Sequence, residues 1–283
     1  MISRLQQQHE PCLSAFLRQD PVSGLFLLGV LHATGIEGAP GRFYGAGLAD
    51  GVERGCGRLG AVAYLADTGL LVPEARDLAL VEELVPVLQS LWWGVRVVVG
   101  PREAVELLWQ GCHRWGRDQP PRLWRGHLLH GLEEAELVDG PEERALRRAL
   151  PGDLDELVVA AAAMRQEELG EDPLHSNPLP FRSRVAQRID AGISWLVRDR
   201  LGIAFKVDVG TLCPEGAQLE GVYTRPDRRG EGLAARSLRR LCRLLLAEVP
   251  QVTLHVWEEN APALACYARV GMRVRAAYRI ALR

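Results

Sequence analysis

The strongest constraint on the fold is a turn of small residues between an expected strand and a long expected helix. Residues 233–248 carry apolar residues at helical spacing beside arginines within 236–243, which predicts one buried stripe and one mostly solvated basic face. Ahead of this helix, Gly230, Gly232 and Ala234 let successive backbone N–H groups turn inward without obstruction by a Cβ atom. Because a helix N-terminus attracts anions, this segment predicts a cradle for a pyrophosphate.

Two common phosphate-binding motifs do not account for the turn. The P-loop pattern G-x-x-x-x-G-K-S/T is absent from the chain. A dinucleotide fingerprint belongs in the first βα unit of a parallel series, and the elements expected around this turn do not follow that order. The turn therefore calls for a different kind of phosphate ligand.

Length and composition bound the class of protein. The 283 residues suffice for two domains of roughly 140 residues each. Hydrophobic residues make up 47% and charged residues 25%, which is typical of a soluble globular protein. A formal net charge of −2 argues against a nucleic-acid partner and against a membrane partner. The chain contains a single lysine, Lys206.

The cysteines and the N-terminal residues favour a cytoplasmic location. Six cysteines, at positions 12, 56, 112, 213, 242 and 266, are scattered singly and form no C-x-x-C pair, which indicates reduced, mostly buried thiols. The first twenty residues mix polar and charged side chains, so no signal peptide is expected. The longest apolar run, residues 157–164, is far shorter than the roughly 20 residues that a membrane-spanning helix needs.

Strand-like and helix-like segments alternate in both halves of the chain, which indicates an α/β fold. In the first half, strands are expected at 42–48, 60–66, 70–72, 95–99 and 122–132, and helices at 78–93 and 102–112. The second half restarts at residue 143 with the order β-α-α-β-β-β-α-β-α-β, its helices expected at 154–169, 181–191, 233–248 and 261–270. Residues 272–282 predict either two final strands or one long strand. A linker at 139–141 predicts two domains, residues 1–138 and 139–283.

The small-residue turn also fits a longer pattern. Residues 229–234 give R-x-x-G-x-A, which resembles the acyl-CoA-binding signature of the GNAT superfamily of N-acetyltransferases. Downstream, Asn260, Ala263, Tyr267 and Gly271 resemble that superfamily's second motif, where a helix ends near the acceptor. The order of expected elements around the two motifs is also similar to that of the GNAT fold. The resemblance covers residues 143–283.

Three further segments resemble a tandem subgroup of this superfamily: residues 166–170 (QEELG), 205–206 (FK) and 218–224 (QLEGVYT). In that subgroup a GNAT-like domain precedes the active one, and mycothiol synthase is similar in architecture only. The resemblance implies an α/β (α+β) chain of two GNAT-like domains, each a mixed, mostly antiparallel sheet flanked by helices. Because residues 1–138 lack R-x-x-G-x-G/A, we expect a degenerate first domain and a catalytic domain at 139–283.

The resemblance implies an enzyme that transfers an acetyl group from acetyl-CoA, its co-substrate, to a primary amine by direct attack in a ternary complex. It makes Tyr267 the acid that protonates the departing thiolate, because a phenol with an ordinary pKa near 10 is a donor at neutral pH. Glu220 is the candidate base, and Glu167 and Glu168 are rivals for that role or for binding the amine. The backbone N–H of Val222 would polarise the thioester carbonyl. The residues implied to bind the cofactor are Val222, Tyr223, Thr224, Arg229, Gly230, Glu231, Gly232, Leu233, Ala234, Ala235, Asn260 and Ala263.

The sequence leaves other interpretations open. A non-catalytic acyl-CoA-binding module with a regulatory or partner-binding role would carry the same motifs, and so would an enzyme for a longer acyl group. Tyr267 is alternatively a core residue, and Glu220, Glu167 and Glu168 are alternatively solvated. The acceptor is expected to be a small molecule or a peptide N-terminus, and the sequence indicates neither which of the two nor an oligomeric state.

Two details qualify this interpretation. Glu231 fits the cradle least well, because an acidic side chain weakens the attraction of a polyanion, and arginines at 228, 229 and 236 would compensate. His127 and His130 have the spacing of a helical metal pair, but their segment is expected to be a strand, so no metal site is predicted.

Overall fold

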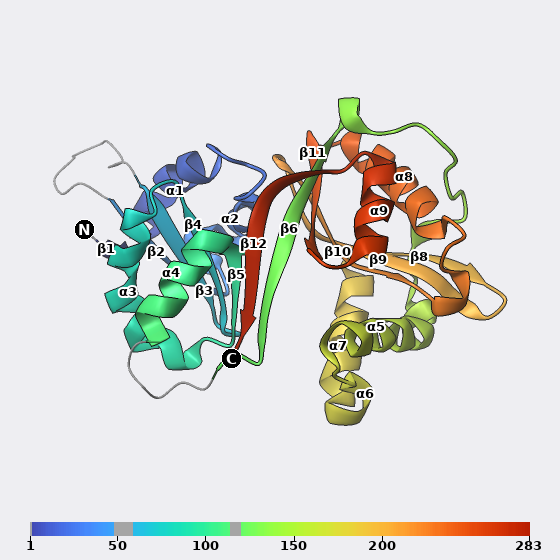
Figure 1. Cartoon of the computed structure of the whole chain (residues 1–283), viewed down its shortest axis with the longest axis horizontal. Coiled ribbons are helices and arrows are strands. Elements are labelled where there is room, and N and C mark those ends of the chain that lie inside the picture. Colours follow the sequence, from blue (N-terminus) through green and yellow to red (C-terminus); the bar gives the residue numbers. More distant parts are fainter. Residues whose placement is uncertain (1, 48–58, 114–119) are drawn as a thin grey trace. The chain divides into compact units, whose positions relative to one another are not determined.

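A computed structural model describes residues 2–47, 59–113 and 120–283 of the chain, which divide into two compact units (Figure 1). The first unit comprises the residues up to 130 together with 255–260 and 274–283, and the second comprises 131–254 together with 261–273. The chain therefore crosses between units at 130/131, 254/255, 260/261 and 273/274. The assignment of a degenerate domain to 1–138 and a catalytic domain to 139–283 stays a prediction.

The first unit contains a mostly antiparallel sheet whose neighbouring strands follow the order β1-β2-β3-β4-β5-β12-β6. Strands β4 and β5 run parallel, whereas β12 runs antiparallel to β5. The C-terminal strand β12 therefore lies inside this sheet, between β5 and β6. The strands are β1 (Ile2–Arg4), β2 (Gly41–Ala46), β3 (Ala61–Ala66), β4 (Leu70–Ala75), β5 (Val97–Pro101), β6 (Leu123–Glu133) and β12 (Arg273–Leu282).

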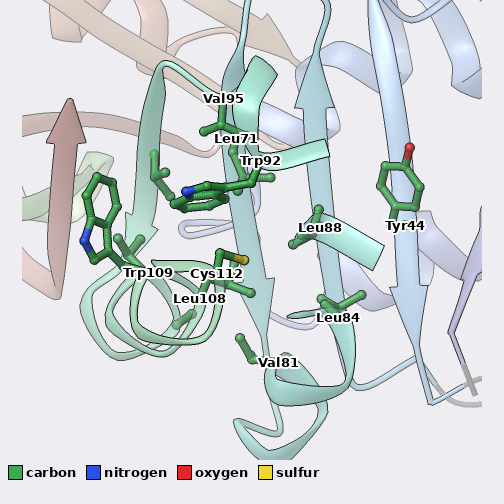
Figure 2. Close-up of a cluster of buried hydrophobic side chains, with 14 of the residues drawn as sticks. Tyr44, Leu71, Val81, Leu84, Leu88, Trp92, Val95, Leu108, Trp109 and Cys112 are labelled. Atoms are coloured by element: carbon green, nitrogen blue, oxygen red, sulfur yellow. The ribbon is translucent and has the colours of Figure 1, made fainter. Parts of the chain in front are cut away.

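The helices of the first unit bury an apolar core against this sheet. They are η1 (Gln7–His9), α1 (Glu10–Leu17), α2 (Leu25–Gly38), α3 (Ala79–Leu91), η2 (Trp92–Gly94) and α4 (Arg102–His113). Leu84 and Leu88 of α3 and Leu108 of α4 are fully buried in one cluster with strand residues such as Leu71 (Figure 2). Trp92 and Trp109 pack edge to face in the same cluster, with ring centroids 5.5 Å apart.

The second unit contains strands in the order β11-β10-β9-β8-β7, with β10 and β11 parallel and the other pairs antiparallel. Helices α5 and α7 pack against one another and bury strand residues that include Leu196, Ile203 and Tyr223. The strands are β7 (Arg147–Arg148), β8 (Ser194–Asp199), β9 (Gly202–Cys213), β10 (Gly216–Thr224) and β11 (Gln251–Trp257). The helices are η3 (Glu134–Glu136), η4 (Pro151–Asp153), α5 (Leu154–Leu169), α6 (Pro173–Ser176), α7 (Pro178–Asp190), η5 (Pro226–Arg228), α8 (Leu233–Leu246) and α9 (Ala261–Val270).

The expected fold class, α/β with a mostly antiparallel sheet, is confirmed. The bounds of three helices agree closely with the prediction: α5 and α9 have the predicted bounds, and α8 ends two residues earlier than predicted. The expected strand at 143–149 shrinks to the two residues of β7, and residues 273–282 form one long strand. Helices α1 and α2 were not predicted. Among the described residues, every helix is too short or too polar to span a membrane.

The cysteines differ in part from the expectation of reduced thiols. Cys112, Cys213, Cys242 and Cys266 form no disulfide, and burial raises the pKa of the Cys242 thiol to about 12. Cys12 is disulfide-bonded, so the expectation is wrong there, and Cys56 lies outside the described residues. A cytoplasmic location stays a prediction.

The arginine face of α8 departs from the mostly solvated surface that its periodicity predicts at one residue, Arg239, and its other arginines are partly exposed. Arg239 is 6% exposed, and its guanidinium donates to the carbonyl oxygens of Val138 at 2.8 Å, Pro141 at 2.7 Å and Arg269 at 3.0 Å. The neighbouring arginines pair with acidic residues just ahead of β7: Arg236 with Glu143, Arg240 with Glu142, and Arg243 with Asp139 and Glu142. The acidic linker therefore packs along the basic face, which a helical periodicity within α8 alone cannot reveal.

Replacing Arg239 by Met is expected to lower the free energy of unfolding by about 3 kcal/mol or more, because three carbonyl oxygens lose a charged donor. Arg240→Met is the matched control: its pair with Glu142 is 3.4 Å long and partly exposed, so its loss should cost less than about 1 kcal/mol. Urea denaturation of both variants measures the difference, and equal losses would contradict the structural role of Arg239.

Candidate functional site

Strand β10 contains a bulge where the predicted site residues begin. Its pairing with β9 matches Glu220 to Asp208 and Tyr223 to Lys206, so Gly221 and Val222 together stand opposite one residue of β9. Gly221 has φ +60°, a left-handed conformation that favours glycine. The recorded pairing of β10 with β11 ends at Leu219, opposite Leu254. Val222 therefore lies where β10 has left the regular ladder on both of its sides.

A buried group of charged side chains lies against the bulge. Lys206 Nζ donates to the Gly221 carbonyl oxygen at 2.9 Å and lies 3.2 Å from Asp208 Oδ2. Lys206 and Asp208 are 2% and 3% exposed. Asp208 also accepts hydrogen bonds from Arg188 Nη1 at 2.9 Å and from Ser194 Oγ at 2.6 Å. The sequence indicated no role for this group, although Lys206 is the sole lysine of the chain and belongs to the FK pair at 205–206.

Ion pairs hold the turn between β10 and α8. Asp199 lies 2.8 Å from Arg225 and 2.5 Å from Arg228, and these hydrogen bonds hold the pKa of the Asp199 carboxyl far below its usual value. Gly230 and Gly232 have φ +79° and +75°, and Gly232 is the N-cap of α8. A Cβ on Gly230 would meet no atom within 4 Å, and one on Gly232 would approach Arg236 Nη1 at 3.6 Å. The backbone conformation, and not crowding, therefore requires both glycines, and the space beside them is open.

Arg229, implied to bind the cofactor, is engaged within the protein. Its Nε donates to the Thr224 carbonyl oxygen at 2.9 Å, and its Nη2 donates to both carboxylate oxygens of Glu167 at 2.9 and 2.7 Å. Its guanidinium carbon lies 5.7 Å from the centre of the Tyr223 ring. The Arg229 side chain thus connects the turn to the end of α5. To bind a phosphate, Arg229 would first have to release Glu167.

Glu231, the least fitting member of the signature, is also paired. Its carboxylate accepts from Arg228 Nε at 2.9 Å, and its carbonyl oxygen accepts from Arg236 Nη1 at 2.8 Å. These contacts partly neutralise the acidic side chain, and they occupy two of the arginines expected to offset it.

A cavity of ≈510 Å³ opens beside the signature turn. It brings the implied cofactor residues Glu231, Gly232 and Ala235 together with the C-terminal part of α9 and the linker that precedes β7. Its lining residues are Val138, Pro141, Glu231, Gly232, Ala235, Arg236, Arg239, Ala268 and Arg269. A cavity of ≈470 Å³ in the first unit is lined by none of the predicted site residues.

The remaining implied cofactor residues occupy the ends of neighbouring elements. Val222, Tyr223 and Thr224 end β10, and Leu233, Ala234 and Ala235 begin α8. Leu233 and Ala235 are buried, so contact with a ligand at these positions would rely mainly on backbone N–H groups. Asn260 precedes α9, where its N–H donates to the Trp257 carbonyl oxygen, and Ala263 lies in the first turn of α9.

Tyr267 lies on α9 and is 6% exposed. Burial, with smaller contributions from Cys266 and the Glu168 carboxylate, raises the pKa of its phenol well above the usual 10. The phenol is therefore a proton donor throughout the physiological pH range. The Glu168 carboxylate at the end of α5 is therefore close enough to the Tyr267 phenol on α9 for its charge to affect the pKa of that phenol.

The three candidate carboxylates have different surroundings. Glu220 is ion-paired with Arg188 Nη2 at 2.6 Å, and Glu167 is held by Arg229. Glu168 is the one of the three that contributes to the raised pKa of Tyr267. Two of the three carboxylates are thus ion-paired with arginines, and the third acts on the pKa of Tyr267.

The two histidines with helical spacing lie on strand β6, as expected, and burial lowers the pKa of each. Residues three apart on a strand face opposite sides, so these side chains cannot converge as a helical pair would. Within the described ranges, no group of three or more His, Cys, Asp or Glu side chains could hold a metal ion.

Comparison with known proteins identifies the class to which this site belongs. Residues 192–272, which include the bulge, the turn and Tyr267, match the model of the acetyltransferase (GNAT) family. The segment that carries the site is therefore similar to the GNAT family, and the resemblance inferred from the two motifs is confirmed. No curated protein matches the chain.

Solved structures with low sequence identity share the fold over the whole chain. A Drosophila protein has a TM-score of 0.70 at 13% identity, with 100% of this chain and 98% of that chain covered. A GCN5-related N-acetyltransferase from Sphaerobacter thermophilus has a TM-score of 0.61 at 16% identity, with 100% and 95% covered. A tandem GNAT protein from the clavulanic acid biosynthesis pathway has a TM-score of 0.51 at 14% identity, with 100% and 98% covered.

Gly221→Ala should destabilise the second unit more than Gly230→Ala. Both positions have positive φ, so each substitution carries a backbone cost of roughly 1–2 kcal/mol. A Cβ on Gly221 would also approach Lys206 Nζ at 2.8 Å and Asp208 Oδ2 at 3.1 Å, whereas one on Gly230 meets open space. Urea denaturation of the two variants compares the costs, and equal losses would argue against a tightly packed bulge.

Proposed function

We propose that the chain is an acyl-CoA-dependent N-acetyltransferase that moves an acetyl group from acetyl-CoA to a primary amine by direct attack in a ternary complex. The observation that carries the proposal is the turn at the N-terminus of α8, where two left-handed glycines leave open space inside a segment of the GNAT family. Acetyl-CoA, when bound, supplies the thioester whose C–S bond breaks.

Each part of the ligand has a group suited to bind it. The pyrophosphate would lie against the N–H groups of Gly230, Gly232 and the first turn of α8, where the helix dipole favours negative charge. The cavity of ≈510 Å³ beside this turn offers room for a further portion of the nucleotide. The pantetheine arm would run along the end of β10, at Val222 and Thr224.

The chemistry requires proton transfers and a stabilised oxyanion. The amine loses a proton to a carboxylate and attacks the thioester carbon, and the developing oxyanion accepts a hydrogen bond from the Val222 N–H. The nitrogen of the tetrahedral intermediate then loses a second proton to solvent, the intermediate collapses, the C–S bond breaks, and Tyr267 donates a proton to the thiolate and regains one from solvent. The products are an N-acetylated amine and CoA.

Glu168 is the carboxylate best suited to take the proton from the amine or to bind it. Its charge acts on Tyr267, so the two groups can serve the same reacting centre. Glu220, which is ion-paired with Arg188, and Glu167, which is ion-paired with Arg229, stay the alternatives for these roles. An acidic group at this place favours a cationic amine, either a small molecule or a peptide N-terminus.

Three further assignments belong to this proposal. Residues 1–138 form a degenerate GNAT-like domain, and residues 139–283 form the catalytic one. The enzyme acts in the cytoplasm. It has neither a nucleic-acid nor a membrane partner, consistent with its net charge of −2.

Isothermal calorimetry with acetyl-CoA tests whether the turn is the ligand site. Gly232→Trp should abolish binding, because the indole would fill the open space beside the turn. Gly192→Trp is the matched control, because Gly192 also has a positive φ, at 68°. A Cβ added at Gly192 would lie 3.6 Å from an arginine Nη1, as one added at Gly232 would. Absence of binding to the unaltered chain would refute the proposal.

Tyr267→Phe is expected to lower kcat by roughly 10²-fold or more while leaving the acetyl-CoA Kd within a few-fold. Because the pKa of the phenol is raised, kcat of the unaltered enzyme should show no loss from phenol ionisation as the pH rises to 10. Turnover over an amine panel, read by release of free thiol, measures both effects. Binding without turnover, unaffected by Tyr267→Phe, would instead identify a non-catalytic acyl-CoA-binding module.

Glu168→Gln should lower kcat/KM for the amine by at least tenfold, because it removes the proposed proton acceptor. Glu167→Gln, the adjacent matched variant, should leave kcat within a few-fold and alter the acetyl-CoA Kd, because it releases Arg229. Steady-state kinetics in both substrates separates the two. The reverse pattern would move the catalytic role to Glu167.

A further inference from the structure

We propose that Lys206, the sole lysine of the chain, is a positioning residue that aims the Val222 N–H at the thioester carbonyl. The inference rests on the proposed function, and it assigns a role to a buried charged group that the reaction itself does not use. Lys206 would touch neither the acetyl group nor the amine. It would act through the peptide group that joins Gly221 to Val222.

One peptide group connects Lys206 to the Val222 N–H. Lys206 Nζ donates to the Gly221 carbonyl oxygen at 2.9 Å. That carbonyl and the Val222 N–H belong to one planar trans peptide group, in which C=O and N–H point in opposite directions. Holding the carbonyl toward Lys206 therefore turns the Val222 N–H away from it.

The bulge leaves this N–H outside the regular ladder. The strand pairing runs from Glu220↔Asp208 to Tyr223↔Lys206, with no residue of β9 matched to Val222. On the other side of β10, the recorded pairs with β11 end at Leu219. Neither neighbouring strand therefore sets the orientation of this peptide group, and the contact from Lys206 takes over that task.

Lys206 is itself rigidly held. It lies 3.2 Å from Asp208 Oδ2, and Asp208 accepts two further hydrogen bonds, from Arg188 and from Ser194. Both charged groups are almost fully buried. A buried ion pair is seldom more stabilising than apolar side chains of the same size, so its presence here points to a task other than stability.

The charge of Lys206 adds a second effect. A cationic donor on a carbonyl polarises the whole peptide group, because hydrogen bonds in a chain strengthen one another. The Val222 N–H would become a better donor to the oxyanion. Loss of Lys206 should therefore lower kcat by roughly tenfold to 100-fold, less than deletion of an oxyanion donor itself, with little change in acetyl-CoA affinity.

Infrared difference spectroscopy with acetyl-CoA labelled with ¹³C at the carbonyl tests this directly and needs no amine. Binding to the unaltered chain should move the labelled carbonyl stretch to lower wavenumber than in buffer. Lys206→Met should lose most of that shift while calorimetry gives a Kd within about threefold of the unaltered chain. Lys206→Arg, which keeps a cationic donor, should retain a substantial part of the shift.

Ser194→Ala is the matched control, because it removes another hydrogen bond to Asp208 and leaves the contact with Gly221 in place. It should keep the full shift. A Lys206→Met variant that folds and binds acetyl-CoA with an unchanged carbonyl stretch would overturn the inference, and so would the absence of any shift in the unaltered chain. Should Lys206→Met fail to fold, Lys206→Gln, a neutral donor, should show a reduced shift, and an unchanged shift would again overturn it. No binding of acetyl-CoA to the unaltered chain would instead refute the proposed function.

Discussion

The hydrogen bond from Lys206 to the Gly221 carbonyl oxygen is the interaction on which the site depends most. Strand β10 would offer backbone groups to a ligand only where they are not hydrogen-bonded to a neighbouring strand. A peptide group without such bonds needs another contact to fix its orientation. The left-handed conformation of Gly221 allows the departure, and the buried ammonium holds the result. At the bulge β10 thus departs from the ladder on both sides, and the buried ammonium of Lys206 holds the peptide group in place.

Ion pairs play a second, separate role around the anion cradle. Asp199 pairs with Arg225 and Arg228, and Glu167 pairs with Arg229, so ion pairs within the protein engage the arginines of the turn. The acidic linker neutralises the face of α8 in a similar way. An incoming pyrophosphate would therefore meet oriented backbone N–H groups and a helix dipole more than free arginines, because most of the arginines nearby are already engaged.

The repeated patterns of the sequence predicted a large part of the fold. The apolar spacing at 78–93 and 233–248 predicted helices that the structure contains as α3 and α8, because a helix must bury one stripe. The signature turn was equally readable, since left-handed backbone demands glycine at 230 and 232. Helices α1 and α2 lacked a comparable pattern, and the burial of Arg239 depends on carbonyl groups that lie 30 to 101 residues away along the chain.

The sequence by itself determined the local chemistry: a glycine turn before a long amphipathic helix, a tyrosine four residues after Ala263, and three glutamates that are candidates for the base or for binding the amine. Only the tertiary structure decided which of these groups act together. It paired Glu167 with Arg229 and Glu220 with Arg188, and it set Lys206 against the bulge. It also brought Glu168 near enough to Tyr267 for its charge to raise the pKa of the phenol. The physical reason is that a turn or helix follows from neighbours in the chain, whereas charge pairing and burial depend on segments that meet only after folding.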